Sequence, residues 1–204
     1  MPQTRPEQTL PNAGPPSWDR GWYAFAARRP SPNFDARPAD TKIDLVVVHA
    51  ISLPPGQYEG HAVEELFTNE LDWLAHPYYQ SIEGLKVSAH FFVRRNGDLL
   101  QFVSCNDRAW HAGVSEHRGR SQCNDFSIGI ELEGLDGDVF EAPQYETLTT
   151  LCAAIMQNYR LTSITGHEHI APGRKTDPGA GFDWSVLAKS LALAPQYLPL
   201  GTKA

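Results

Sequence analysis

The sequence lacks the features that mark membrane-spanning and nucleic-acid-binding proteins. No stretch of it approaches the roughly 18 consecutive apolar residues of a membrane-spanning helix. Basic residues are in the minority, with 17 Lys and Arg against 24 Asp and Glu and a formal net charge of −7. A nucleic-acid-binding surface needs clustered Lys and Arg, and the pairs Arg94–Arg95 and Arg118–Arg120 are too sparse to form one. We therefore expect no membrane and no nucleic acid among its partners, and nothing in the sequence predicts an obligatory protein partner.

Cysteine is also scarce. The three cysteines, Cys105, Cys123 and Cys152, are an odd number and do not make a paired disulfide framework. Reduced thiols inside a cell are the simpler interpretation. The first sixteen residues contain no apolar segment of the kind found in a secretory signal. Together these observations predict a cytoplasmic location.

Residues 1–16 also lack any pattern that could pack. They are rich in proline and polar residues, so we expect a disordered N-terminal tail followed by a single domain over residues 17–204. Because the tail has no apolar area to bury, a chain that starts at Ser17 should keep its thermal unfolding midpoint and its activity. Normal folding with lost activity in that truncated chain would show that the tail is functional.

Hydrophobic patterns predict a single-domain α/β fold with a mixed central β-sheet flanked by helices. Residues 43–48 are a nearly continuous β-branched run, typical of a strand buried on both faces, and residues 126–133 alternate as a second strand. Residues 87–95 and 98–103 predict a hairpin closed by a two-residue type I′ turn at Asn96-Gly97. Helices are expected at 61–71, from Pro143 to about Tyr159, and after Asp183. Residues 22–29 fit a short helix or a loop, and 72–84 a long connection.

Histidines and carboxylates with metal-binding chemistry occur in two places. His49 stands where the first buried strand ends, the usual position of site residues in α/β sheets. The segment 166–179 supplies His167, Glu168, His169 and Asp177. Two imidazoles and one carboxylate, with a fourth position open to water, form a known catalytic zinc site. The residues by themselves do not decide between His167 and His169, or between Glu168 and Asp177.

Three further side chains have the chemistry of catalysis. Lys175 would lie on the same side of an extended segment as Asp177, where its ammonium group would stabilise an oxyanion. Glu131 lies on the polar side of its strand, and Gly129 beside it would leave room for a substrate or a metal. Glu133 shares that side and is the rival carboxylate.

Several segments resemble the 1,6-anhydro-N-acetylmuramyl-L-alanine amidases of the amidase-2 and peptidoglycan-recognition superfamily. The similarity runs in unchanged order over about residues 21–191. The segments that carry it are VVHAISLPPG (47–56), VSAH (87–90), RAWHAGVS (108–115), CNDFSIGIELEG (123–134), GH (166–167), IAP (170–172) and RKTDPG (174–179).

This resemblance implies one zinc ion per chain, held by His49, His167 and Asp177. It implies that Glu131 is the general base and that Lys175 stabilises the oxyanion. The implied substrate is a small soluble anhydro-muropeptide of cell-wall recycling, cut between the lactyl group of the muramic acid and L-alanine. The residues implied to bind it are Tyr78, Lys86, Trp110, His111 and Gln122.

The sequence departs from the family pattern at three positions. Lys86 and Gln122 stand where the family often has arginines that bind carboxylates of the stem peptide, and Ala50 stands where an asparagine often follows the first metal histidine. Lysine does not reproduce a bidentate arginine contact, so the peptide preference is open. Two other functions fit the superfamily: a non-catalytic muropeptide-binding module, expected to lack a metal ligand, and an amidase that lyses intact cell wall.

Overall fold

The computed structural model describes residues 17–199. The predicted tail, residues 1–16, lies outside the described residues, as do residues 200–204. At the centre is a six-stranded sheet with the order β12-β5-β11-β6-β7-β3. Its strands are β3 (Ala27–Arg28), β5 (Leu45–Ile51), β6 (Phe91–Val93), β7 (Leu99–Gln101), β11 (Ser127–Glu133) and β12 (Ser163–Gly166). Neighbours run parallel except β6 and β7, so the predicted mixed α/β sheet is confirmed.

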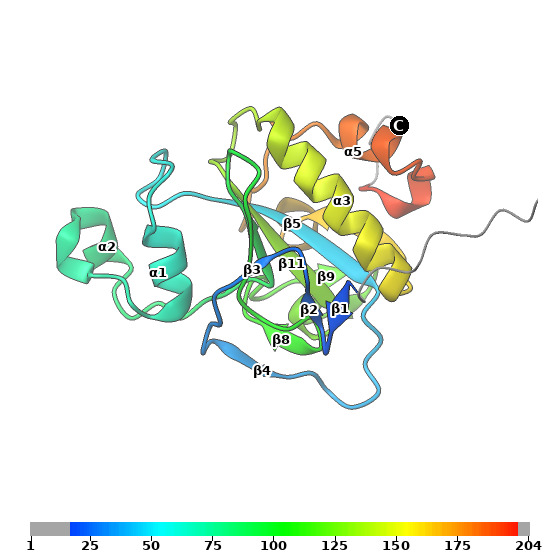
Figure 1. Cartoon of the computed structure of the whole chain (residues 1–204), viewed down its shortest axis with the longest axis horizontal. Helices are drawn as coiled ribbons and strands as arrows, with labels where there is room; N and C mark the ends of the chain where they lie inside the picture. The colour runs from blue at the N-terminus through cyan, green and yellow to red at the C-terminus, as the bar shows by residue number, and fades with distance from the viewer. Residues whose placement is uncertain (1–16, 200–204) are drawn as a thin grey trace, which may run out of the picture.

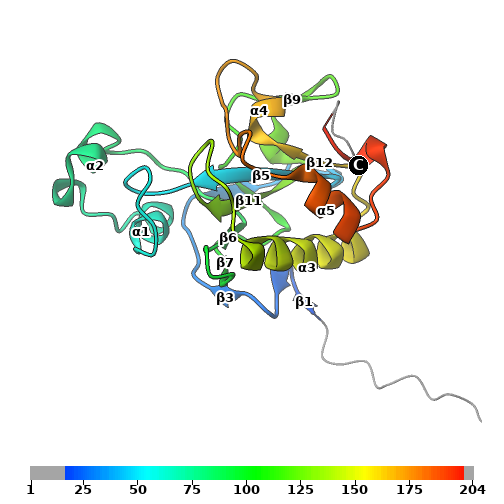
Figure 2. The same cartoon turned by 90° about the horizontal axis from the view of Figure 1, so that it is seen from above.

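Helices α3 (Ala142–Asn158) and α5 (Trp184–Ser190) lie on one face of the sheet (Figure 2). The predicted apolar stripe of α3 is confirmed, since Leu148, Cys152 and Ile155 are buried in one cluster with Ile128 and Ile130 of β11. Asp183 caps α5 by accepting a hydrogen bond from the Ser185 N–H, at 2.8 Å. No helix within residues 17–199 has both the length and the apolar character needed to cross a membrane.

The opposite face of the sheet is also covered. Leu45 and Val47 of β5 are buried there with Ala112, Phe126 and Ile170. Burial on both faces explains why β5 is apolar from Leu45 to Val48, as its sequence predicts. The short α4 (His167–Ile170) follows β12 on this side, and η2 (Cys123–Asp125) leads into β11.

A helical lobe extends from one end of the sheet (Figure 1). It comprises α1 (Ala62–Thr68), η1 (Trp73–Ala75) and α2 (Pro77–Ser81). The helix expected at 61–71 therefore forms over a shorter range. The long connection expected at 72–84 contains two short helices that the sequence analysis missed, since Asp72 caps η1 and Pro77 opens α2. Leu66 and Phe67 of α1 anchor the lobe in a second core cluster with Phe92 and Phe102.

The prediction of a short helix or loop at 22–29 is wrong in part. Residues there form β2 (Trp22–Tyr23), paired with β1 (Trp18–Asp19), and β3, paired with β7. Two other small pairs join β4 (Phe34–Ala36) to β8 (Asp107–Ala109), and β9 (Glu116–His117) to β10 (Arg120–Ser121). The remaining element is η3 (Pro195–Tyr197).

The predicted hairpin forms, but with a different turn. The Gly97 N–H donates to the Arg94 carbonyl, so Arg95 and Asn96 occupy the centre of the turn. Gly97 has a φ of +90°, whereas Asn96 is not among the residues with positive φ. A type I′ turn needs positive φ at both central residues, so the two-residue turn is replaced by a three-residue loop that ends in Gly97.

Candidate active site

The site lies where three parallel strands end. In the register of the sheet Glu131 of β11 is directly opposite His49 of β5, so their side chains leave the same face. Gly166, the last residue of β12, pairs with Val48, which places His167 next to His49. Residues far apart in the chain thus meet at the carboxyl edge of the sheet, the usual location of sites in α/β folds.

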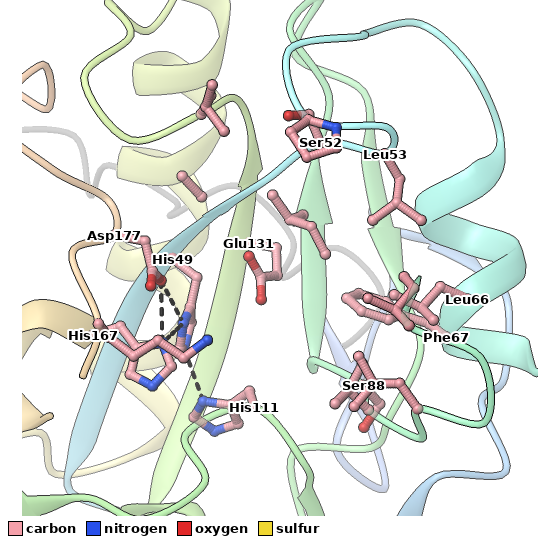
Figure 3. A pocket seen from close by; sticks show the side chains of 18 of the residues that line it. His49, Ser52, Leu53, Leu66, Phe67, Ser88, His111, Glu131, His167 and Asp177 are labelled. Atoms are coloured by element: carbon pink, nitrogen blue, oxygen red, sulfur yellow. Dashed lines mark hydrogen bonds and ion pairs between the residues drawn. The ribbon is translucent and has the colours of Figure 1, made fainter. Parts of the chain in front are cut away.

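The side chains of His49, His167 and Asp177 point toward one another (Figure 3). The Nδ1 atoms of the two histidines are 3.0 Å apart, and Asp177 Oδ2 lies 3.1 Å from His49 Nδ1 and 3.2 Å from His167 Nδ1. One potential ligand atom from each residue lies within 4.8 Å of the other two.

The two alternatives left open by the residue types lie elsewhere. His169 turns away: its Nδ1 accepts the Gly166 N–H at 3.2 Å, and its ring packs on Trp184. The backbone N–H of Glu168 donates a hydrogen bond to the backbone carbonyl oxygen of Asp177 at 2.8 Å. Neither side chain belongs to the cluster of His49, His167 and Asp177.

The three clustered side chains fit a metal ion chemically. The Nε2 atoms of both histidines are already engaged, that of His49 at 2.9 Å from His111 Nδ1 and that of His167 at 3.0 Å from the Ala112 carbonyl oxygen. The Nδ1 lone pairs are therefore free to face Asp177. Two such nitrogens and a carboxylate oxygen repel one another unless a cation or a proton lies between them. Donors of this kind are those that zinc prefers.

Burial and mutual contacts set the charges of this cluster. Burial lowers the pKa of His49 to about 4, so its imidazole is neutral at pH 7 and able to act as a ligand. Burial alone would raise the pKa of Asp177, but its contacts with the His167 and His49 rings outweigh burial and hold this pKa below the usual range. Asp177 is thus an anion over the whole neutral range.

Glu131 is a buried carboxyl group beside the cluster. It is 8% exposed, and within residues 17–199 its Oε2 atom has no hydrogen-bond partner. Burial, with a contribution from the charge of Asp177, raises the pKa of Glu131 well above its ordinary value. A buried carboxyl group with a raised pKa and an unused oxygen is suited to accept a proton and to return it.

The pocket around these groups has a volume of about 290 Å³. Glu131 lies between the His49, His167 and Asp177 cluster and a pocket wall that includes Leu53, Leu66 and Phe67 (Figure 3). Several residues predicted to act on the substrate do line this pocket, namely Tyr78, Trp110, His111 and Lys175. Lys86 and Gln122 are exposed and are not among its lining residues, so their contact with a stem peptide stays a prediction. Ala50 does line it.

Two expectations about β11 need correction. Glu133 does not compete with Glu131, because its two carboxylate oxygens accept the backbone N–H groups of Glu59 and Arg95 at 2.8 and 3.0 Å. The space beside Gly129 is not open to substrate or metal. A Cβ on Gly129 would lie 2.4 Å from His111 Cγ, so the missing side chain makes room for the His111 ring. Residue spacing gave no signal for the contact of that ring with His49.

The chain matches the family model described as N-acetylmuramoyl-L-alanine amidase over residues 39–180. It is 51% identical over 169 residues to the 1,6-anhydro-N-acetylmuramyl-L-alanine amidase AmpD of Citrobacter freundii, an alignment that covers 82% of this chain and 90% of the relative. The corresponding protein of Escherichia coli K12 is 49% identical, with 82% and 92% covered.

Solved structures show the same relationship. A crystal structure of a selenomethionine derivative of AmpD superposes with a TM-score of 0.83 at 49% identity, covering 85% of this chain and 98% of that one. The amidase AmiD of E. coli, in complex with the substrate anhydro-N-acetylmuramic acid-L-Ala-D-γ-Glu-L-Lys, has a TM-score of 0.54 at 28% identity, covering 76% and 60%.

Proposed function

Because the chain belongs to the N-acetylmuramoyl-L-alanine amidase family, we propose that it is a zinc-dependent 1,6-anhydro-N-acetylmuramyl-L-alanine amidase. Its substrate is a small soluble anhydro-muropeptide, cut at the amide bond between the lactyl group and L-alanine in cytoplasmic peptidoglycan recycling. The observation that carries the proposal is the convergence of His49, His167 and Asp177 next to the buried Glu131, whose Oε2 atom has no hydrogen-bond partner within residues 17–199.

His49, His167 and Asp177 would hold the metal through two Nδ1 atoms and one carboxylate oxygen. When bound, a zinc ion there supplies Lewis-acid chemistry: it polarises the amide carbonyl and lowers the pKa of water to about 7. The protein contributes a fixed donor set at the ends of β5 and β12 and in the segment that follows α4.

Glu131 is the proposed general base. Its carboxylate takes the proton of the water molecule as that water attacks the amide carbon, and then returns the proton to the leaving nitrogen of L-alanine. Both transfers are eased by the raised pKa of Glu131, which burial produces. Lys175, in the wall of the same pocket, places a positive charge near the oxyanion that forms on the carbonyl oxygen.

Tyr78 of α2 and Trp110, in the segment after β8, both line the pocket and are proposed to contact the substrate. His111 also lines it, although most of its ring is engaged by neighbours. Lys86 and Gln122 remain proposed contacts for the stem peptide beyond the pocket.

Metal content tests the central part of this proposal. The purified protein should contain about one equivalent of zinc, and a strong chelator should abolish hydrolysis that added zinc restores. Full activity in excess chelator, with no zinc detected by elemental analysis, would contradict the metal assignment.

Products distinguish this function from its two alternatives. A defined anhydro-muropeptide should yield free anhydro-muramic acid and free peptide, identified by mass, whereas intact sacculi should release little soluble material. Binding without cleavage would indicate a recognition module, and rapid release from sacculi would indicate a wall-lytic amidase.

A further inference from the structure

Two consecutive residues contact both histidines of the His49, His167 and Asp177 cluster. The side chain of His111 lies against His49, with His111 Nδ1 2.9 Å from His49 Nε2. The carbonyl oxygen of Ala112, the next residue, lies 3.0 Å from His167 Nε2. The dipeptide His111–Ala112 therefore contacts each of the two histidines at the ring nitrogen that faces away from Asp177.

One buried side chain holds this dipeptide in place. Asn124 in η2 is 5% exposed, and its Oδ1 accepts the backbone N–H groups of both His111 and Ala112, at 3.2 and 2.8 Å. The turn that carries Asn124 is itself fixed by Arg37, whose guanidinium donates to the carbonyl oxygens of Asn124 and Asp125 at 3.0 and 2.7 Å.

The hydrogen bonds at His111 form a chain with one consistent direction. With the Nδ1 lone pair of His49 facing Asp177, its ring proton is on Nε2 and is donated to His111 Nδ1. The proton of His111 is then on Nε2 and is donated to Ser127 Oγ, 3.1 Å away. The Ser127 hydroxyl donates in turn to the Cys123 carbonyl oxygen at 2.6 Å, so the chain ends at a backbone acceptor.

The His111 ring has little freedom to leave this position. It fills the space over Gly129, where any Cβ would collide with it, and it stands nearly perpendicular to the His49 ring, with an interplanar angle of 83°. Sterics and hydrogen bonds thus select the same ring orientation.

We propose that Asn124 and His111 are positioning residues for the metal site. Asn124 fixes the His111–Ala112 dipeptide, and the dipeptide sets the ring orientation and the tautomer of His49 and His167, so that both Nδ1 atoms face Asp177. This inference rests on the zinc site of the proposed function. Partners that orient metal-ligating histidines typically contribute about 10- to 100-fold to metal affinity.

The test compares zinc affinities of full-length variants, measured by competition with a chromophoric chelator. Asn124→Leu removes the acceptor of both N–H groups and should weaken zinc binding about 10- to 100-fold. Asn124→Asp keeps an acceptor oxygen at the same place and should restore affinity to within a few-fold of the unaltered chain. Wild-type affinity in a folded Asn124→Leu chain would overturn the proposal.

Gln144→Leu is the matched control. Gln144 is a fully buried amide on α3 that is not among the pocket-lining residues, and it forms hydrogen bonds with the backbone of Glu133 and Glu141. Its loss should lower the thermal unfolding midpoint and leave zinc affinity unchanged. An equal loss of zinc affinity in Gln144→Leu would mean that Asn124 acts through general stability, which would also overturn the proposal.

A second variant covers the case in which Asn124→Leu does not fold. His111→Phe keeps a ring over Gly129 but has no nitrogen to accept from His49, so zinc affinity should again fall about 10-fold or more. Nitrogen-15 spectra of the zinc-loaded protein should show a His49 Nε2 proton that exchanges slowly with solvent in the unaltered chain and faster in this variant, because the acceptor His111 Nδ1 is lost. Unchanged affinity and an unchanged exchange rate of that proton would overturn the proposal. Zinc binding without hydrolysis in the unaltered chain would contradict the proposed function and leave this inference standing.

Discussion

Replacing Glu131 with glutamine should slow hydrolysis of an anhydro-muropeptide at least about 10²-fold, because loss of a general base typically costs 10²- to 10⁴-fold in rate. The substitution keeps the size and burial of the side chain but removes the group that accepts the proton of the attacking water. Glu131 is not a member of the cluster of His49, His167 and Asp177, so zinc content and substrate affinity should stay close to those of the unaltered protein. Steady-state kinetics measure the rate of hydrolysis and report on substrate affinity, and elemental analysis of the same sample measures the zinc content.

Glu133→Gln is the control for this experiment. Glu133 lies two residues further along β11, but its oxygens bind the backbone N–H groups of Glu59 and Arg95, and it lies near Arg94. Its substitution should lower the thermal unfolding midpoint more than the turnover rate. Near-normal turnover by Glu131→Gln at full zinc occupancy would refute the role of Glu131, and loss of zinc would make it a residue that supports the ligands.

Replacing Asp177 with alanine should abolish both zinc binding and hydrolysis. Asp177 Oδ2 is the only carboxylate oxygen in the cluster, at 3.1 and 3.2 Å from the two Nδ1 atoms, and it supplies the negative charge that favours a dication there. Elemental analysis and titration with zinc should show no binding at micromolar metal. Stoichiometric zinc in Asp177→Ala would contradict the ligand assignment.

His169→Ala provides the contrast. His169 is only two residues from His167, yet its ring packs on Trp184 and its Nδ1 accepts the Gly166 N–H. Loss of that hydrogen bond should cost about 1 kcal/mol of stability, while most of the zinc and of the activity should remain. If His169→Ala emptied the site and His167→Ala did not, the assignment of the two histidines would be reversed.

The elements that the sequence predicted well are those whose pattern is long and local. Three such segments form as expected: the β-branched run before His49, the alternation that ends at Glu133 and the apolar stripe from Leu148 to Ile155. The spacing of apolar residues predicts the element, because a period of two residues puts them on one face of a strand and a period of 3.6 puts them on one face of a helix. Short elements were predicted poorly. Residues 27 and 28 become a strand only because Leu100 and Gln101 lie beside them, and that partner is more than seventy residues away.

The hairpin shows a similar limit. Asn96-Gly97 marked the position of the turn correctly, but two loop lengths are compatible with that dipeptide. The register of Phe91 opposite Gln101 selected the longer one, with Gly97 alone at positive φ. Pairing of the flanking strands therefore determined a backbone conformation that local residue preferences left undecided.

By itself the sequence determined which chemistry was present: a histidine at a strand end, a segment rich in histidine and carboxylate, and acidic residues on one side of a strand. Its resemblance to a family implied which of them act. The residues alone did not separate His167 from His169 or Glu131 from Glu133, because the members of each pair are chemically identical and two positions apart. The tertiary structure distinguishes them, by turning His167 toward His49 and His169 toward Trp184. It also brings His111 against His49 across Gly129, a contact between three separate segments that only the folded sheet creates.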